Sequence, residues 1–413
     1  MTNLFLKRLT GAIWCFPLGV VCASFLQSQA LAGDWNSWLA TQINQHPDVL
    51  AAKERWQGMN ANAEAMGQPI YNPALSVGAD RNGDENNYAV GLEQTIDLWD
   101  RRSVNTKQAT FLKTAAMHMY KQQVLNKTAE VVAALVEWKT ASQAADIAQS
   151  QKVQLTSLLQ LVDAQQKTGD IGAVDAQLTL LSLSQQIAQV ADIEASLVRA
   201  EVQLQELLPE WSQSRGGLPD DFWPSSIVEA TDENLSQYPL VASSEAMWRS
   251  KIEHAESVRR AAKPDPTFGI NAGRDGGDSL VGLTVSVPLH VRNNFDAESR
   301  EAQSLELEAE AQWIATFRKQ RVNWRAARSS WQRYEYHLNS WQSLLGNRVN
   351  NSEQLLERQW QSGDLSTPNY LLALNQRTES LLAGIELEKQ ALLALTEALY
   401  QSGQLATLIQ PMN

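Results

Sequence analysis

Residues 72–101, which read NPALSVGADRNGDENNYAVGLEQTIDLWDR, decide the fold. From Leu75 onward apolar residues alternate with small or polar ones, an Asn/Gly/Asp turn follows, and the alternation resumes from Tyr88 to Leu98. A period of two on both sides of a turn predicts a β-hairpin. One face of this hairpin suits an apolar medium and the other suits water.

The hairpin pattern occurs a second time, in residues 265–293, which read DPTFGINAGRDGGDSLVGLTVSVPLHVRN. Four landmarks of the first half return 191 to 194 residues later: His46-Pro47 as Tyr238-Pro239, Pro73 as Pro266, Gly91-Leu92 as Gly282-Leu283, and Gly169-Asp170-Ile171 as Gly363-Asp364-Leu365. A nearly constant offset indicates an internal duplication. Two hairpins then supply four strands.

Almost all of the remaining sequence is helical in pattern. A proline-free run predicts one helix over 100–167, about 100 Å long at 1.5 Å per residue, and a returning helix over 173–208. The second half repeats this plan, with an outgoing helix over 295–361. Heptad spacing in the two returning helices predicts coiled-coil seams: Leu183, Ile187, Val190, Leu197, Leu204 and Leu208, then Leu371, Leu374, Leu381, Ile385, Leu392, Leu395 and Leu399. Helices this long predict a rod or tube rather than a globular core.

The predicted fold is therefore mainly α with a small β part. Its predicted segments are a signal peptide, residues 1–32; a first repeat, residues 33–230, with a β-hairpin at 73–98 and a long helical hairpin at 99–208; and a second repeat, residues 231–413, with a β-hairpin at 266–289 and a long helical hairpin at 293–402.

The N-terminus has the order of a secretory signal peptide. Lys7 and Arg8 precede an apolar run, residues 9–26, and a small-residue site predicts cleavage after Ala32. A membrane anchor is one alternative, and a lipoprotein attached through Cys22 is another.

Composition and motifs argue against most other classes of function. Both cysteines, Cys15 and Cys22, lie in the predicted signal peptide, and its removal takes the formal charge from −12 to −14 because Lys7 and Arg8 leave with it. Such acidity argues against nucleic-acid binding. The histidines are scattered, and no HExxH, P-loop or Ser/His/Asp pattern occurs, so we predict no catalytic, cofactor or metal site and no enzyme.

The four predicted strands bear on how the chain meets a membrane. A lone hairpin is marginal in water, and strands that cross lipid must close into a barrel because every backbone group needs a partner. The smallest such barrels have about eight strands. A chain with four strands must therefore associate with at least one other copy.

Several motifs together resemble a known family. They are NPxL before the first hairpin, GLEQTIDLW followed by Arg101 and Arg102, the duplicate of this region, and the two Gly-Asp turns. The chain resembles the TolC-like outer-membrane efflux proteins, and within them the heavy-metal (CzcC-like) branch. The resemblance covers essentially the mature chain. It implies a homotrimer in the outer membrane, with a β-barrel of four strands per chain joined to a periplasmic α-barrel of coiled-coil helices.

The resemblance also implies partners and a mode of action. A periplasmic membrane-fusion adaptor and an inner-membrane pump would work with the channel, and substrate would pass through the lumen passively, as metal cations in this branch. Adaptor contact is implied at the two helical turns, which contain Gly169 and Gly172, and Gly363 and Pro368. Outer-membrane lipid would surround the barrel.

The resemblance implies a periplasmic gate near the same turns. Counted from Gly363, the family's gate acids correspond to Asn369 and Leu372, which are uncharged. The constriction is then polar and apolar, or it is an acidic ring formed by the remaining candidates, Asp170, Asp175 and Asp364. Helix capping is the alternative role for the aspartates.

In the barrel, Glu93 and Asp97 are predicted to face the lumen and, with the net negative charge, to favour cations. Two alternative functions stay open. One is a drug-efflux or type I secretion channel, and the other is a non-conducting periplasmic coiled-coil scaffold, which would lack a consistent lipid-facing surface on its hairpins.

Overall fold

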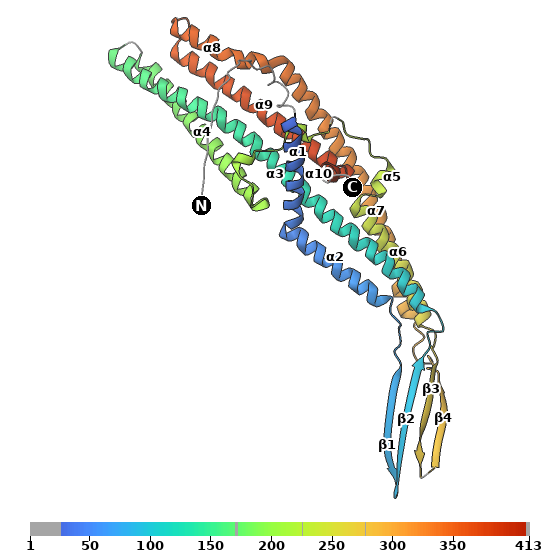
Figure 1. Ribbon diagram of the computed structural model, residues 1–413. Helices are drawn as coiled ribbons and strands as arrows, with labels where there is room; N and C mark the ends of the chain where they lie inside the picture. Colours follow the sequence, from blue (N-terminus) through green and yellow to red (C-terminus); the bar gives the residue numbers. More distant parts are fainter. Residues whose placement is uncertain (1–25, 170–171, 225, 277, 410–413) are drawn as a thin grey trace, which may run out of the picture.

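The computed structural model describes residues 26–169, 172–224, 226–276 and 278–409. Most of the predicted signal peptide, including Cys15 and Cys22, lies outside the described residues. The molecule is an elongated rod with a β-sheet at one end and helix tips at the other (Figure 1). The helices are α1 (Leu26–Gln45), α2 (Pro47–Met66), α3 (Arg101–Thr168), α4 (Ala173–Leu207), α5 (Asp232–Ser236), α6 (Pro239–Ala261), α7 (Asp296–Trp341), α8 (Asn347–Gln361), α9 (Thr367–Ser402) and α10 (Leu405–Ile409).

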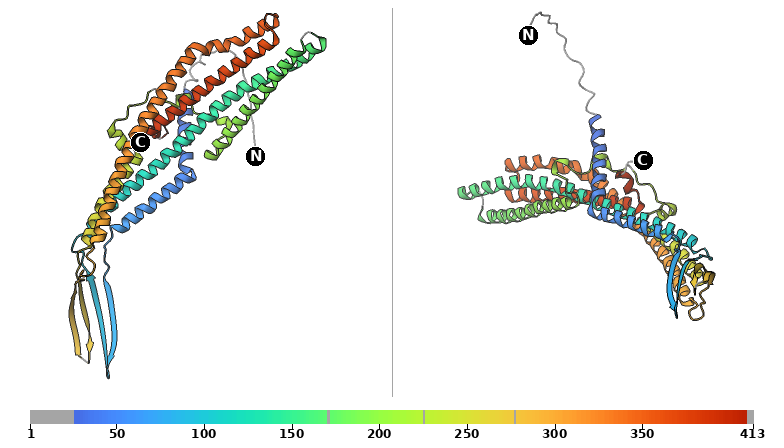
Figure 2. Two further views of the ribbon diagram at one scale, coloured as in Figure 1. Left: turned by 180° about the vertical axis from the view of Figure 1, so that it is seen from behind. Right: turned by 60° about the horizontal axis from the view of Figure 1, so that its bottom comes forward.

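The order of elements repeats, as the duplication predicts. The series α2, β1, β2, α3, α4 returns as α6, β3, β4, α7 with α8, and α9. Near the sheet, α2, α3, α6 and α7 lie side by side, whereas toward the tips the neighbours are α4, α3, α9 and α8 (Figures 1 and 2). Within the described residues, no helix combines the length and hydrophobicity needed to cross a bilayer.

The outgoing helices of the two repeats differ. The first, α3, is one helix of 68 residues, as predicted. The second was predicted as one helix over 295–361, but a π-helical turn, Gln342–Gly346, separates α7 from α8 and coincides with a visible bend (Figure 1). Immediately before this turn, the indole ring of Trp341 lies against Gly384 of α9, where a Cβ atom would overlap it.

Among the described residues, buried side chains form three clusters that hold the helices together. The smallest, Leu235, Trp324, Ala327 and Ala398, joins α5, α7 and α9, and the other two are larger. Of these two, the larger lies around the middle of the rod and includes Leu39, Val131, Leu135, Leu204, Leu208, Trp211, Phe222, Tyr238, Leu399 and Leu405. The smaller lies near the tips and consists of Leu155, Leu158, Leu183, Tyr370, Leu371 and Leu374. Most of the predicted seam leucines are buried or half-buried within the chain, whereas Ile187 is 53% exposed and has no seam partner within the described residues of this chain. Helix α4 lies at one side of the helical layer, so part of its apolar surface faces away from α3 (Figure 1).

The four strands form one antiparallel sheet in the order β1-β2-β3-β4. Their bounds are β1 (Ala74–Asn82), β2 (Glu85–Thr95), β3 (Thr267–Asp275) and β4 (Asp278–Ser286). Both hairpins form where the alternating pattern predicted them. The strand β2 ends at Thr95 rather than Leu98, because the segment that follows belongs to the junction with α3.

Candidate functional site

The register of the sheet places side chains of like character in rows across its strands. The first row is Leu75, Leu92, Ile270 and Leu283, and the second is Val77, Val90, Ala272 and Val281. These side chains stand on one face and point away from the rest of the chain, with 81% of Val281 and 83% of Leu283 exposed. An exposed apolar surface of this extent marks contact with lipid or with another protein.

The opposite face of the sheet is small, polar and acidic. Glu93 stands on this face, with its side chain over Gly269: a Cβ atom there would lie 3.1 Å from Glu93 Cγ. The charged residues that the register assigns to this face are all acids: Asp80, Glu85, Glu93, Asp275 and Asp278. The strand arginines, Arg81 and Arg274, fall on the apolar face. One face of the sheet is therefore apolar and has the strand arginines, and the other is polar and has the strand acids.

Asp97, the second predicted lumen residue, has a structural contact of its own. It lies two residues beyond β2, and its carboxylate accepts the backbone N–H groups of Arg101 and Arg102 at 2.9 Å each. A carboxylate at a helix N-terminus satisfies donors that the helix leaves free. Asp97 thus caps α3, and Glu93 is the predicted lumen residue that the structure places on the polar face.

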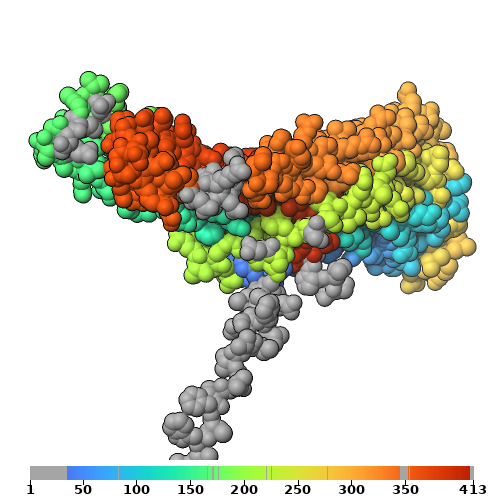
Figure 3. All heavy atoms as spheres, turned by 90° about the horizontal axis from the view of Figure 1, so that it is seen from above, coloured from blue at the N-terminus to red at the C-terminus, as the bar shows by residue number. Residues whose placement is uncertain are grey.

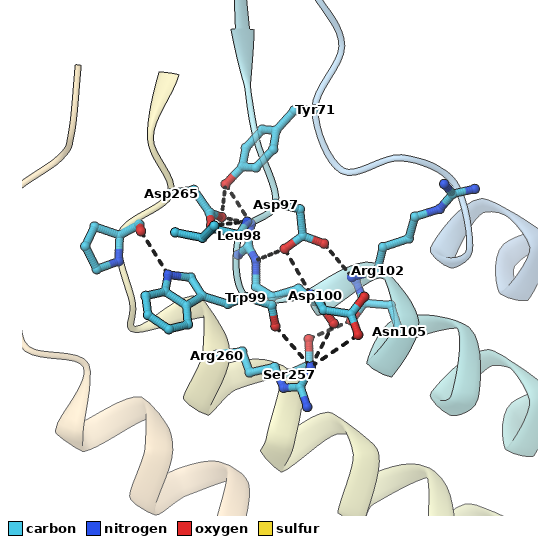
Figure 4. Close-up of polar contacts among 12 residues, drawn as sticks. Tyr71, Asp97, Leu98, Trp99, Asp100, Arg102, Asn105, Ser257, Arg260 and Asp265 are labelled. Carbon is cyan, nitrogen blue, oxygen red and sulfur yellow. Dashed lines mark hydrogen bonds and ion pairs between the residues drawn. The ribbon is translucent and has the colours of Figure 1, made fainter. Parts of the chain in front are cut away.

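A buried polar network joins the sheet to the helices (Figure 4). Asp265, just before β3, is 6% exposed. Its carboxylate accepts the Tyr71 hydroxyl at 3.0 Å and the Leu98 backbone N–H at 3.1 Å, and it lies 3.3 Å from Nη2 of Arg101. Arg101 also donates to the Tyr71 hydroxyl oxygen at 2.7 Å. Burial, followed by the hydrogen bond to Asp265, raises the pKa of Tyr71.

The outer side of this junction is fixed by Trp99 and Arg260. The Trp99 indole donates to the carbonyl of Pro264 at 2.9 Å, and the ammonium group of Lys263 lies 4.4 Å from the indole centroid. Arg260 donates to the carbonyls of Trp99 and Asp100 at 3.0 and 2.9 Å. Sequence reasoning missed these roles. The available signal was the charge of Asp265, the residue directly before the repeat landmark Pro266.

The helix tips, which lie at the same end of the molecule (Figure 3), contain the predicted turns. Gly169 and Gly363 have φ angles of +80° and +82°, in the region that favours glycine. Gly172 is the N-cap of α4, and Pro368 lies in the first turn of α9. The second turn is held by stacking of Trp360 on Tyr370, with ring centroids 4.7 Å apart.

The predicted gate residues occupy these tips. Asp364 is exposed and accepts the Ser362 hydroxyl at 2.8 Å, while the N-cap of α9 is Ser366, so capping by Asp364 is wrong. Asn369 and Leu372 are exposed one turn apart on α9. Of the first-half candidates, Asp170 lies outside the described residues, and Asp175 falls in the first turn of α4. Among the described residues, no group of three or more His, Cys, Asp or Glu side chains is arranged to hold a metal ion.

Long antiparallel helices that continue into an amphipathic four-stranded sheet define the fold of the TolC-like channels. The chain is similar to a membrane protein from Pseudomonas aeruginosa, at 17% identity and a TM-score of 0.75 over 90% of each chain. It is similar to the Campylobacter jejuni CmeC outer membrane channel, at 13% identity and a TM-score of 0.75 over 98% of this chain and 94% of that one. It is also similar to CusC, at 16% identity and a TM-score of 0.72, over 89% of this chain and 92% of that one.

The sequence itself also matches a family. Residues 38–209, most of the predicted first repeat, match the model of the outer membrane efflux protein family. No curated protein sequence matches the chain.

Proposed function

We propose that this chain is the passive outer-membrane channel of a tripartite efflux system, with its helices in the periplasm, and that metal cations pass through it. The observation that carries this proposal is the sheet, with one exposed apolar face, one acidic face and two open edges. A periplasmic adaptor and an inner-membrane pump would supply recognition and energy. The proposed activity is transport and not catalysis.

The open edges support association of copies. In the described sheet, β1 has β2 as its neighbour and β4 has β3, so each has one edge without a strand beside it. Backbone groups on such an edge must be paired when they enter lipid. The helix α4 presents a further surface for association, because its exposed apolar side chains include Val174, Leu178, Leu181, Ile187, Val198 and Val202. Closure by three copies is the arrangement that the family resemblance implies.

The acidic face supports cation passage. If the polar face lines the lumen, Glu93 and the other acids on this face attract cations into it. The test is the single-channel conductance and the cation/anion permeability ratio of the purified protein in planar bilayers, with its oligomer mass measured in the same detergent. We expect a trimer with long-lived, cation-selective currents.

Two variants make this test specific. Glu93→Lys is expected to shift the permeability ratio toward anions, whereas Asp97→Asn, in the α3 cap, is expected to leave it unchanged. A monomer or dimer that never conducts would contradict the channel and favour a periplasmic scaffold. Conduction with equal selectivity in wild type and Glu93→Lys would contradict the position of Glu93 in the lumen.

The proposed gate lies at the tips and the adaptor contacts lie on the turns. Asn369 and Leu372, with Asp364 and the first-half Asp170 and Asp175, would line the constriction. The turns containing Gly169, Gly172, Gly363 and Pro368 would meet the adaptor. Leu372→Trp, which adds bulk at an exposed site, is expected to lower the conductance. An unchanged conductance would place the constriction elsewhere.

A further inference from the structure

Two arginines lie on the apolar face of the sheet, at the end remote from the helices. Arg274 occupies a row with Ala79, Tyr88 and Ser279, directly beyond the row that contains Val77 and Val281. Arg81 lies one row farther out on the same face. Tyr88 is 58% exposed beside Arg274. The apolar rows therefore end in an aromatic ring and two guanidinium groups.

The spacing of the two arginines suits two separate anionic groups. Arg81 is on β1 and Arg274 on β3, so they are about 10 Å apart across the sheet and one row, about 7 Å, apart along the strands, which separates their Cα atoms by about 12 Å. Arg81 donates from Nε to the carbonyl of Gly83 at 3.0 Å, and its Nη2 lies 3.5 Å from Asp84, while 65% of its side chain stays exposed. A guanidinium group has five N–H donors, so these contacts leave others available.

The placement of charge indicates what covers this surface. The acids of the strands fall on the opposite face, so no strand carboxylate shares the apolar face with these arginines. From the row of Phe268 to the row of Arg274 the apolar face runs six residues, about 20 Å. Arginine and tyrosine at the border of an apolar band are typical of the level at which lipid headgroups lie.

We propose that Arg81 and Arg274, flanked by Tyr88, bind the phosphate groups of lipid headgroups in the leaflet remote from the helices. The inference rests on the proposed membrane position of the sheet. Guanidinium groups form charge-assisted, bidentate hydrogen bonds with phosphate oxygens. The apolar rows would hold the acyl chains of the same lipids.

The test is native mass spectrometry of the purified protein, titrated in neutral detergent with phosphatidylglycerol, with the two-phosphate lipid A, and with zwitterionic phosphatidylcholine. Wild type is expected to prefer the two anionic lipids. The double variant Arg81→Gln/Arg274→Gln is expected to lose roughly 25-fold in affinity for them, about fivefold for each arginine. Arg81→Lys/Arg274→Lys keeps the charge and is expected to retain most of the preference.

Two controls separate this inference from the proposed function. Arg333→Gln removes an exposed arginine on α7, far from the sheet, and is expected to leave lipid affinity unchanged. Conductance of each variant is measured in bilayers. If wild type conducts but binds all three lipids equally, or if the double variant keeps the full preference, the lipid site is overturned and the channel stands. If wild type never conducts, the channel proposal fails, whatever the lipid preference.

Discussion

The two repeats join the same sheet to similar helices, yet their junctions are built differently. At the central junction, where β2 leaves for α3 and α6 arrives at β3, Asp265 is buried and binds Tyr71, Leu98 and Arg101. The position that corresponds to Asp265 in the first repeat is Asn72, which is exposed in front of β1. Both residues precede a proline, so the same position of the repeat is buried in the second repeat and exposed in the first.

The sheet order explains the difference. The strands β2 and β3 are neighbours in the middle, so the segments that enter and leave them meet each other. The segments next to β1 and β4 lie at the edges. The segment before β1 contributes Tyr71 to the central network, whereas residues 287–295 link β4 to α7 with exposed side chains such as Leu289 and Val291. The best-packed junction between sheet and helices therefore lies where the two repeats of the chain meet. The edge junctions face the surface on which we propose that the next copy packs.

The largest expected effect comes from breaking the central junction. Asp265→Ala leaves Arg101, which is 17% exposed, without its buried carboxylate partner, and should lower the free energy of unfolding by about 3 kcal/mol. The matched variant Asn72→Ala should change it by less than about 0.5 kcal/mol. Denaturation in detergent, followed by circular dichroism, measures both. Equal losses would mean that the two junctions are equivalent after all.

The second test extends the comparison to the outgoing helices. Gly384→Ala places a methyl group against the Trp341 ring, next to the π turn that the first repeat lacks, and should cost about 2 kcal/mol. Gly58→Ala, in α2, meets no atom within 4 Å and should stabilise by about 0.5–1 kcal/mol. Thermal melts of the two variants should therefore move in opposite directions. A higher melting temperature for Gly384→Ala would show that the Trp341 ring moves aside without loss of stability.

The third test compares how the two outgoing helices begin. Asp97→Ala removes an acceptor from two backbone N–H groups of α3 and should cost about 1.5 kcal/mol. The side-chain Oδ1 of Asn293 accepts the backbone N–H of Phe295, the N-cap residue of α7, which has no side-chain cap of its own, and Asn293→Ala should cost about 0.5–1 kcal/mol. Denaturation midpoints rank the two helix starts. The reverse order would place the more firmly held helix start at the edge of the sheet.

The sequence predicted the elements well but predicted contacts between distant elements less well. Alternation located both hairpins, and the absence of proline located α3, because both signals are local. The end of β2 was misplaced because Leu98 is held by Asp265, 167 residues away. The π turn was missed because its neighbour Trp341 packs on Gly384 of another helix. Ile187 fits the heptad but is exposed, since a heptad predicts a seam without saying which chain fills it.

The smallest expected effect is a pH dependence of the central junction. Burial and the hydrogen bond to Asp265 raise the pKa of Tyr71 above its usual value of 10.0. Above about pH 10 the unfolded chain releases this proton while the folded chain keeps it, so the free energy of unfolding falls as the pH rises through this window. Below it, the contribution of the tyrosine is fully present.

Tyr71→Phe tests this contribution within the comparison of the two repeats, because the corresponding position in the second repeat is Pro264, which cannot titrate. The variant should cost about 1 kcal/mol at neutral pH, through the lost hydrogen bonds to Asp265 and Arg101. Its melting temperature should then fall less steeply than that of wild type above about pH 10. If the two alkaline slopes are equal, Tyr71 ionises as freely in the folded chain as in water. The firmness of the central junction would then rest on Asp265 and Arg101 alone.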